Sequence, residues 1–132
     1  MNEPIHTAKC MCGEITLEAH GEPEYVEYCH CKWCQQSSGS SYIVWVIFKK
    51  EYVKVTSGKL HHYNKSEALE RGFCANCGST MTVLSKRHFD IALGVMDRPE
   101  DFKITQHIWT KRALKHVRLD DGLPSYAENG PN

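Results

Sequence analysis

Residues 29–34 read Cys-His-Cys-Lys-Trp-Cys, the longest of three cysteine clusters in the chain. Two shorter clusters accompany it, one at residues 10–13 (Cys-Met-Cys-Gly) and one at residues 74–78 (Cys-Ala-Asn-Cys-Gly). Together the three clusters hold all seven cysteines of the chain. Spacings of one or two residues let neighbouring sulfur atoms turn toward one point, which is typical of metal ligands. An odd number of cysteines also excludes a framework in which every cysteine is paired.

Seven thiolates divide naturally into four and three. A structural zinc takes four ligands in a tetrahedron, and four thiolates are a common set. The first and last clusters could supply that set and would clamp the first strand to a later turn. Its ligands would be Cys10, Cys12, Cys74 and Cys77. The middle cluster leaves Cys29, Cys31 and Cys34. Three protein ligands with a vacant fourth position are typical of a catalytic zinc.

Three other interpretations stay open on spacing alone. A C-x-x-C pair can be a redox dithiol, and a single four-cysteine zinc can coexist with three incidental thiols. A second site could also be closed by His30 or another histidine and be purely structural. His30 lies between two of the cysteines on a strand-like stretch, so its side chain should point away from theirs. We therefore expect a surface or packing role for His30.

Length and composition predict one globular domain. The chain has 132 residues, 41% hydrophobic and 24% charged, which excludes a disordered protein. Its 16 basic and 16 acidic residues cancel, whereas a nucleic-acid binder usually carries a basic excess. The longest apolar run, residues 42–48, is far shorter than the roughly 20 residues of a membrane-spanning helix. The first residues lack the apolar segment of a secretory signal, so we expect a cytoplasmic protein with reduced thiols.

Most of the chain predicts short strands separated by turns. Period-2 alternation and β-branched or aromatic runs place strands at residues 14–19, 25–28, 41–49, 52–56, 60–63, 67–73, 80–84, 89–93 and 102–109. Residues 67–71 could instead be helical by propensity. A polar turn is expected at 64–66 and one helical turn at 98–101, while residues 1–5 and 128–132 should be loose. Strands at this spacing predict an all-β domain.

The order of the cysteine clusters resembles the glutathione-dependent formaldehyde-activating enzyme / centromere protein V family. The pattern is C-x-C-G, then C-H-C-x-x-C, then G-F-C-x-x-C-G-S. Further matching pieces are Gly39, Arg71-Gly72-Phe73, and residues 93–97, 107–109 and 119–126. The resemblance runs from about Thr7 to Tyr126, and it implies a single zinc-binding domain across residues 1–132.

The resemblance implies an Mss4-like fold, built of several twisted antiparallel sheets with zinc sites. It also implies two zinc ions per chain. The structural zinc would be held by Cys10, Cys12, Cys74 and Cys77, and the catalytic zinc by Cys29, Cys31 and Cys34. The implied activity is that of a carbon–sulfur lyase, which makes or breaks an S-hydroxymethyl adduct. Its substrates would be a small thiol, glutathione or another, and an aldehyde.

Three thiolates suit a thiol substrate better than hydrolysis. They make zinc a weaker Lewis acid than three histidines do, which disfavours bound hydroxide, whereas a coordinated thiol is deprotonated outright. A proton must also move near Cys31. Side chains that could move it are His62, His88, His107, Asp97, Ser37 and Ser38. Gln35 and Gln36 could bind substrate or cap the turn, and Trp33 could line the pocket.

A competing hypothesis is a non-enzymatic zinc module that binds protein or nucleic acid. The basic residues between 111 and 118 could contact a phosphate backbone, but a solvated face is the better interpretation, so nucleic acid is not expected as a partner. A redox enzyme of the methionine sulfoxide reductase type would need a free nucleophilic cysteine, and every cysteine here lies in a metal-like cluster. Exposed sheet edges could pair two copies, so a homodimer is one expectation. No membrane partner is expected.

Overall fold

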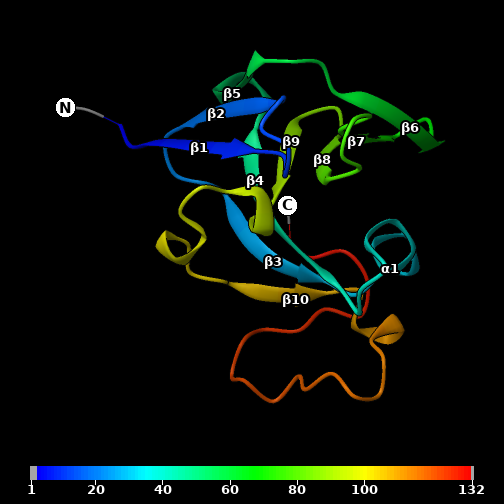
Figure 1. Ribbon diagram of the computed structural model, residues 1–132. Helices are drawn as coiled ribbons and strands as arrows, with labels where there is room; N and C mark the ends of the chain where they lie inside the picture. Colours follow the sequence, from blue (N-terminus) through cyan, green and yellow to red (C-terminus); the bar gives the residue numbers. More distant parts are fainter. Residues whose placement is uncertain (1–2, 132) are drawn as a thin grey trace.

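A computed structural model of the chain describes residues 3–131, apart from the side chain of Lys65. In that part of the chain, ten strands form two sheets (Figure 1). The smaller sheet has the order β1-β2-β5, and the larger has the order β10-β3-β4-β9-β8-β7-β6. Neighbouring strands are antiparallel except for β10, which runs parallel to β3. The prediction of an all-β protein with antiparallel sheets is confirmed.

The smaller sheet contains β1 (Ile5–Lys9), β2 (Thr16–His20) and β5 (Val53–Ser57). The sequence predicts β2 and β5 but not β1, and the expectation that Ile5 is loose is wrong. Only Ala8 is buried in β1, so the hydrophobic pattern there is weak. The strand exists because it pairs with β2 along its whole length. The first two residues, also expected to be loose, lie outside the described part.

The larger sheet contains seven strands: β3 (Tyr25–Cys29), β4 (Ile43–Lys49), β6 (His61–Ser66), β7 (Leu69–Phe73), β8 (Thr80–Leu84), β9 (His88–Ala92) and β10 (Gln106–Ile108). The helical alternative for residues 67–71 is wrong, because β7 pairs with strands on both sides. The expected turn at 64–66 instead lies in β6, with an irregular register after Tyr63. Strand β10 covers only residues 106–108 of the predicted 102–109, and the hydroxyl of Thr105 just before it donates to the carbonyl of Val26.

One helix, α1 (Lys32–Ser38), lies beside the larger sheet and was not expected (Figure 1). It begins at Cys31, whose sulfur accepts the backbone N–H of Cys34 at 3.2 Å, as a serine or aspartate cap would. It ends at Gly39, which adopts the left-handed conformation with φ 70°. Short 3₁₀ turns follow at Lys50–Tyr52, Leu93–Val95, Pro99–Asp101 and Thr110–Arg112. The third of these confirms the helical turn expected at 98–101.

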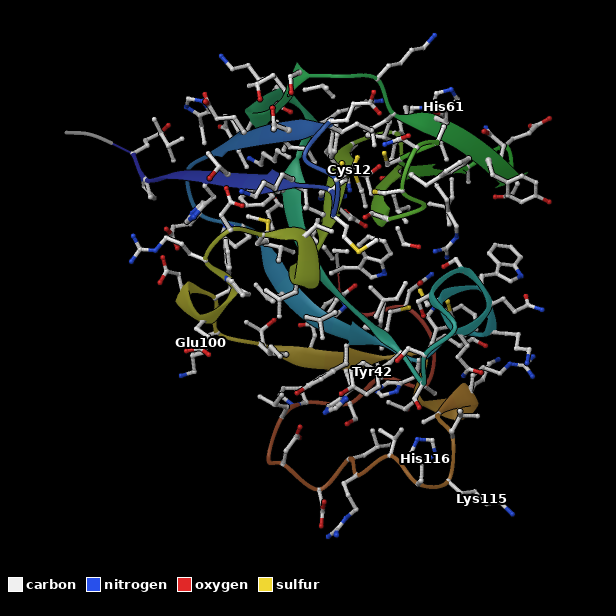
Figure 2. All side chains as sticks on the ribbon, in the orientation of Figure 1. Cys12, Tyr42, His61, Glu100, Lys115 and His116 are labelled. Carbon is white, nitrogen blue, oxygen red and sulfur yellow. The ribbon has the colours of Figure 1, made fainter. Side chains whose placement is uncertain are left out.

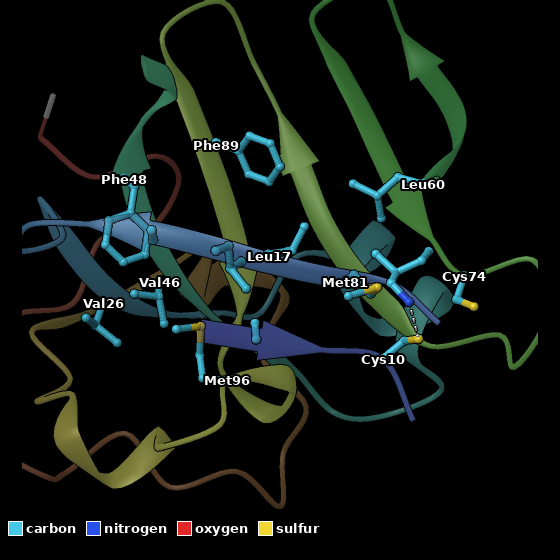
Figure 3. Packing of buried hydrophobic residues seen from close by; sticks show 14 residues of the cluster. Cys10, Leu17, Val26, Val46, Phe48, Leu60, Cys74, Met81, Phe89 and Met96 are labelled. Carbon is cyan, nitrogen blue, oxygen red and sulfur yellow. Dashed lines mark hydrogen bonds between the residues drawn. The ribbon is translucent and has the colours of Figure 1, made fainter. Parts of the chain in front are cut away.

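Strand β4 is buried on both faces and separates two hydrophobic clusters. Val46 and Phe48 point into the first cluster, which fills the space between the two sheets (Figure 3). Trp45 and Ile47 point into the second cluster, on the other face of the larger sheet. A strand covered on both faces is expected to be apolar throughout, and residues 43–48 are. The second cluster contains Cys29 and Cys34, and therefore carries the middle cysteine cluster.

The tail returns to the larger sheet instead of hanging loose. The backbone N–H of Trp109 donates to the carbonyl of Glu128 at 2.9 Å, and its indole N–H donates to the Asn129 side chain at 2.9 Å. The expectation of a loose segment at 128–132 is therefore wrong for its described residues, since residue 132 lies outside them. Within the described residues, no helix is long and apolar enough to cross a membrane.

Candidate metal centres

The four outer cysteines, which we call the tetrad, bring their sulfur atoms together at one edge of the first cluster. The tetrad is Cys10, Cys12, Cys74 and Cys77, and its sulfur atoms all lie within 4.8 Å of one another. Cys10 and Cys12 are 3.6 Å apart, and Cys12 and Cys74 are 3.8 Å apart, both measured between sulfur atoms. A tetrahedral zinc with bonds of about 2.3 Å needs sulfur–sulfur distances of roughly 3.8 Å. The tetrad could therefore hold such an ion. Figure 3 shows Cys10 and Cys74 at this edge of the core.

Two tight turns bring the tetrad together, and the first closes with a hydrogen bond of 3.0 Å from the Gly13 N–H to the Cys10 carbonyl. The turn that joins β7 to β8 closes with a hydrogen bond of 2.8 Å from the Gly78 N–H to the Cys74 carbonyl, and Gly78 has φ +79°. Ser79 accepts the backbone N–H of Met11 at 2.9 Å and directs its own hydroxyl to the Cys77 sulfur at 3.1 Å. This hydroxyl holds the pKa of Cys77 at about 6, so the thiolate form dominates at neutral pH.

The three middle cysteines, which we call the trio, meet where β3 leads into α1. The trio is Cys29, Cys31 and Cys34, with all sulfur atoms within 4.8 Å of one another. Cys29 ends β3, Cys31 caps the helix, and Cys34 lies in its first turn. Cys29 and Cys34 are buried, whereas Cys31 is only half-buried. The trio is therefore open to solvent on the side of Cys31, and it could hold a metal ion with that side exposed.

Hydrogen bonds within the trio favour negative charge on Cys31, whereas the pKa values of Cys29 and Cys34 are raised. Thiols of Cys29 and then Cys34 donate to Cys31 and hold its pKa far below the usual value. The indole N–H of Trp45 donates to the Cys34 sulfur at 3.4 Å. The guanidinium of Arg71 donates to the same sulfur at 3.7 Å. Metal binding requires deprotonated thiols, and the Trp45 and Arg71 donors would stabilise that form at Cys34.

His30 is buried, so the surface position considered for it is wrong and the packing role fits. Its Nε2 atom lies 2.9 Å from Nδ1 of His107, and Nε2 of His107 lies 2.7 Å from an Asp121 carboxylate oxygen. A carboxylate only accepts, so His107 donates to Asp121, and when both rings are neutral His30 donates to His107. The ring of Tyr28 stacks on His107 with centroids 4.5 Å apart, and Tyr42, labelled in Figure 2, meets Tyr28 edge-on.

Three other side chains considered for proton transfer are engaged or placed elsewhere. His88 bonds to Glu24 at 2.7 Å and pairs with Lys49, at the opposite end of β4 from the trio. Asp97 accepts the Thr7 hydroxyl at 2.6 Å. His62 is exposed and, by strand alternation, faces away from the side on which Arg71 lies.

Residues of α1 mostly stabilise the helix and its surroundings. The Gln35 side-chain amide donates to the carbonyls of His30 and Arg112, at 2.9 and 3.0 Å, so it pins the turn. Ser38 donates to the Cys34 carbonyl at 2.7 Å. Ser37 accepts a hydrogen bond from Arg71 at 3.2 Å. Gln36 is exposed, and Trp33 is 37% exposed on the same helix.

Comparison with known proteins supports the family resemblance that the cysteine pattern suggests. Residues 5–112 match a protein family described as the glutathione-dependent formaldehyde-activating enzyme. The chain belongs to this family. The resemblance seen in the order of the cysteine clusters is thereby confirmed.

Two curated relatives carry related descriptions. An uncharacterised lyase of Schizosaccharomyces pombe is 31% identical over 78 residues, which are 59% of this chain and 56% of that protein. A Colletotrichum graminicola protein, named as a candidate glutathione-dependent formaldehyde-activating enzyme, is 28% identical over 119 residues, 87% of this chain and 53% of that protein. The chain thus spans about half the length of the curated relatives that it matches.

A solved structure shares the fold of this member of the formaldehyde-activating enzyme family. A Rhodobacter sphaeroides protein superimposes with a TM-score of 0.58 at 15% identity, covering 91% of this chain and 98% of that chain. At such low identity the likeness shows the fold alone. The designation Mss4-like stays a prediction.

Three polar residues around the tetrad and the trio could not be predicted from the spacing of the cysteines. Ser79 follows the last cysteine pair, and its position in C-x-x-C-G-S was the only signal for it. Arg71 precedes that pair by three residues but contacts the trio instead. Asp121 reaches His107 only because the tail folds back, with Ser125 bridged to His107.

The basic residues Lys115 and His116 project from the returning tail, and His116 bonds to Ser41 (Figure 2).

Proposed function

We propose that this chain is a zinc-dependent carbon–sulfur lyase that forms or cleaves an S-hydroxymethyl-type adduct of a small thiol and an aldehyde. The observation that carries the proposal is the trio: three clustered sulfur atoms, two of them buried, with the third facing solvent. A closed four-sulfur site has no room for a substrate, whereas a three-sulfur site leaves one position. The family and the lyase description of one relative support the same class of reaction.

The proposal assigns one zinc to each cluster within a single domain of residues 1–132. The tetrad would hold a structural ion, since its four sulfur atoms satisfy a tetrahedron. The trio would hold the ion at which the substrate binds. A zinc ion at the trio supplies a soft Lewis acid, which favours a thiol in its deprotonated form over water.

The side chains around the trio have distinct roles in this reaction. In the forward direction a thiol adds to the aldehyde carbon, a carbon–sulfur bond forms, and the thiol proton ends on the new hydroxyl oxygen. The half-buried Cys31 marks the side from which both substrates approach. The indole of Trp45 and the guanidinium of Arg71 withdraw charge from Cys34 through their hydrogen bonds to its sulfur. Such donors also fix the orientation of a metal ligand.

Metal analysis and an exchange assay test the proposal together. The wild-type protein should contain two zinc ions per chain, and the Cys31→Ser variant should lose one and remain folded. With formaldehyde and either glutathione or 2-mercaptoethanol, the wild-type protein should speed adduct exchange measured by NMR, and Cys31→Ser should not. Ser40→Ala, at an exposed position outside both clusters, serves as the control. A fully zinc-loaded wild-type protein that leaves the uncatalysed rate unchanged for both thiols would refute the proposal.

A further inference from the structure

Arg71 lies on the same face of the larger sheet as the trio. In the strand register, Arg71 pairs with Val83, Val83 with Asp90, and Asp90 with Ile47. Residues directly opposite one another in antiparallel strands project to the same side. Val83 and Ile47 belong to the second cluster, which also contains the buried trio cysteines. The register therefore brings a cation from β7 to the metal centre on α1.

The Arg71 side chain is committed to the trio and its helix. One terminal nitrogen lies 3.7 Å from the Cys34 sulfur, and the other lies 3.2 Å from the Ser37 hydroxyl. Its Nε atom is buried and has no hydrogen-bond partner in the described part of the chain. Over residues 3–131, no carboxylate lies within ion-pair distance of Arg71 either. Among the described residues, its hydrogen bonds therefore go to the Cys34 sulfur and the Ser37 hydroxyl.

Asp90, two strands away in the same row, forms no ion pair with Arg71 among the described residues. Its Oδ1 atom is buried without a hydrogen-bond partner among the described residues. Burial raises the pKa of Asp90 well above its usual value, the Glu27 carboxylate raises it further, and Arg71 opposes both effects. A half-buried arginine without a carboxylate partner is costly unless an anion faces it.

The charge of the trio changes when a substrate thiol arrives. Three thiolates and a divalent ion carry one negative charge in excess, and a deprotonated thiol adds a second. Two buried thiolates and a half-buried third provide little water to screen this charge. A guanidinium held at the Cys34 sulfur offsets part of this negative charge at the sulfur atoms themselves. Lysine could supply the same charge without the planar two-nitrogen contact to sulfur and hydroxyl.

We propose that Arg71 is the residue that offsets the charge of the substrate thiolate at the trio and thereby sets thiol affinity. The inference rests on the proposed function and adds to it a positioning residue that acts through Cys34. It predicts that Arg71 affects thiol affinity through the charge on the substrate sulfur, and not through a charge elsewhere on the thiol. A neutral thiol and a thiol that bears a carboxylate should therefore depend on Arg71 equally.

Thiol titration of the cobalt-loaded full chain tests this inference. Absorption difference spectra would report binding of 2-mercaptoethanol, which is neutral, and of mercaptoacetate, which carries a carboxylate. The variants are Arg71→Gln, Arg71→Lys and, as matched control, Arg87→Gln at an exposed position in the turn between β8 and β9. Loss of a hydrogen bond to a charged group predicts that Arg71→Gln binds both thiols about tenfold more weakly. Arg71→Lys should stay within about threefold of the wild type, because it keeps the charge, and Arg87→Gln should match the wild type.

Four outcomes of this titration would contradict the role of Arg71 or the proposed function. An Arg71→Gln variant that holds its metal and binds both thiols as the wild type does would overturn the inference. So would a loss confined to mercaptoacetate, since Arg71 would then recognise the carboxylate. If Arg71→Gln does not fold or load cobalt, Arg71→Lys decides, because a tenfold loss in a folded, loaded Lys variant contradicts charge compensation. A wild-type protein that responds to neither thiol would refute the proposed function itself, and the Arg71 inference with it.

Discussion

Replacing Gly72 by alanine probes the strand contact that holds Arg71 in place. An added Cβ at Gly72 would lie 2.1 Å from the Thr82 hydroxyl oxygen and 3.4 Å from a Leu60 methyl carbon. Gly72 and Thr82 pair directly across β7 and β8, and both are buried. Threonine is stiff at χ1 because it is β-branched, so Thr82 cannot relieve the clash as the end of a long flexible side chain could. Strand β7 must therefore shift.

The expected loss is about 2 kcal/mol of unfolding free energy, in the middle of the range for overpacked cores. For a domain of this length, 1 kcal/mol corresponds to a Tm change of about 3–5 °C. The Gly72→Ala variant should therefore unfold roughly 6–10 °C below the wild type. Circular dichroism at a fixed zinc concentration measures this, because bound metal itself raises Tm.

A control variant, Gly94→Ala, and a rescue by Thr82→Ala distinguish the Gly72–Thr82 clash from a general effect of replacing glycine by alanine. At Gly94 an added Cβ meets nothing within 4 Å, and the backbone is not left-handed, so Gly94→Ala should change Tm by less than about 2 °C. Thr82→Ala removes the clashing oxygen, which has no hydrogen-bond partner within residues 3–131. The double variant should then be more stable than the sum of the two single changes by at least about 1 kcal/mol. Equal Tm for the two glycine variants, or strict additivity, would refute the reasoning.

Three further changes test the polar groups around the centres. Burial raises the pKa of Asp90, so folding stability should fall as the pH rises above the ordinary aspartate value of about 4 toward the folded pKa. In urea unfolding between pH 5 and pH 8, the unfolding free energy of Asp90→Asn should fall less steeply with pH than that of the wild type. Equal pH dependence of the two proteins would contradict this. His107→Phe keeps a ring against Tyr28 but leaves Nε2 of His30 buried without its partner, so we expect a loss of about 1–3 kcal/mol with unchanged zinc content; a loss of zinc in metal analysis would contradict this. Gly78→Ala places a side chain at φ +79° in open space and should cost about 1–2 kcal/mol. Gly78→Asn should cost less in thermal unfolding, and the reverse order would argue against strain as the cause.

The parts of the fold that follow from local sequence are the buried strands and the cysteine spacing. Residues 43–48 have one dominant property, an apolar run covered on both faces, and they form most of β4. The cysteines are placed by spacings of one or two residues, which leave the backbone few ways to separate them. In both cases the information is contained within a few consecutive residues.

Other elements depend on partners far along the chain. Helix α1 has a single buried residue, Cys34, so it shows no hydrophobic period, and its ends are set by the Cys31 cap and by Gly39. Strand β1 forms only against β2. The contact of Arg71 with Cys34 spans 37 residues, and it requires the whole order of the larger sheet. Propensity and spacing cannot supply such contacts.

The hairpin of β7 and β8 joins the two centres physically. The turn of this hairpin carries two tetrad cysteines, while its strands hold α1: the Thr80 hydroxyl donates to the Ser37 carbonyl at 3.0 Å, and Arg71 donates to the Ser37 hydroxyl. In the proposed arrangement, the ion at the tetrad therefore fixes the hairpin that positions Arg71 and the helix bearing Cys34. In this proposal the four cysteines of the structural site would determine the geometry of the three cysteines at which the substrate binds.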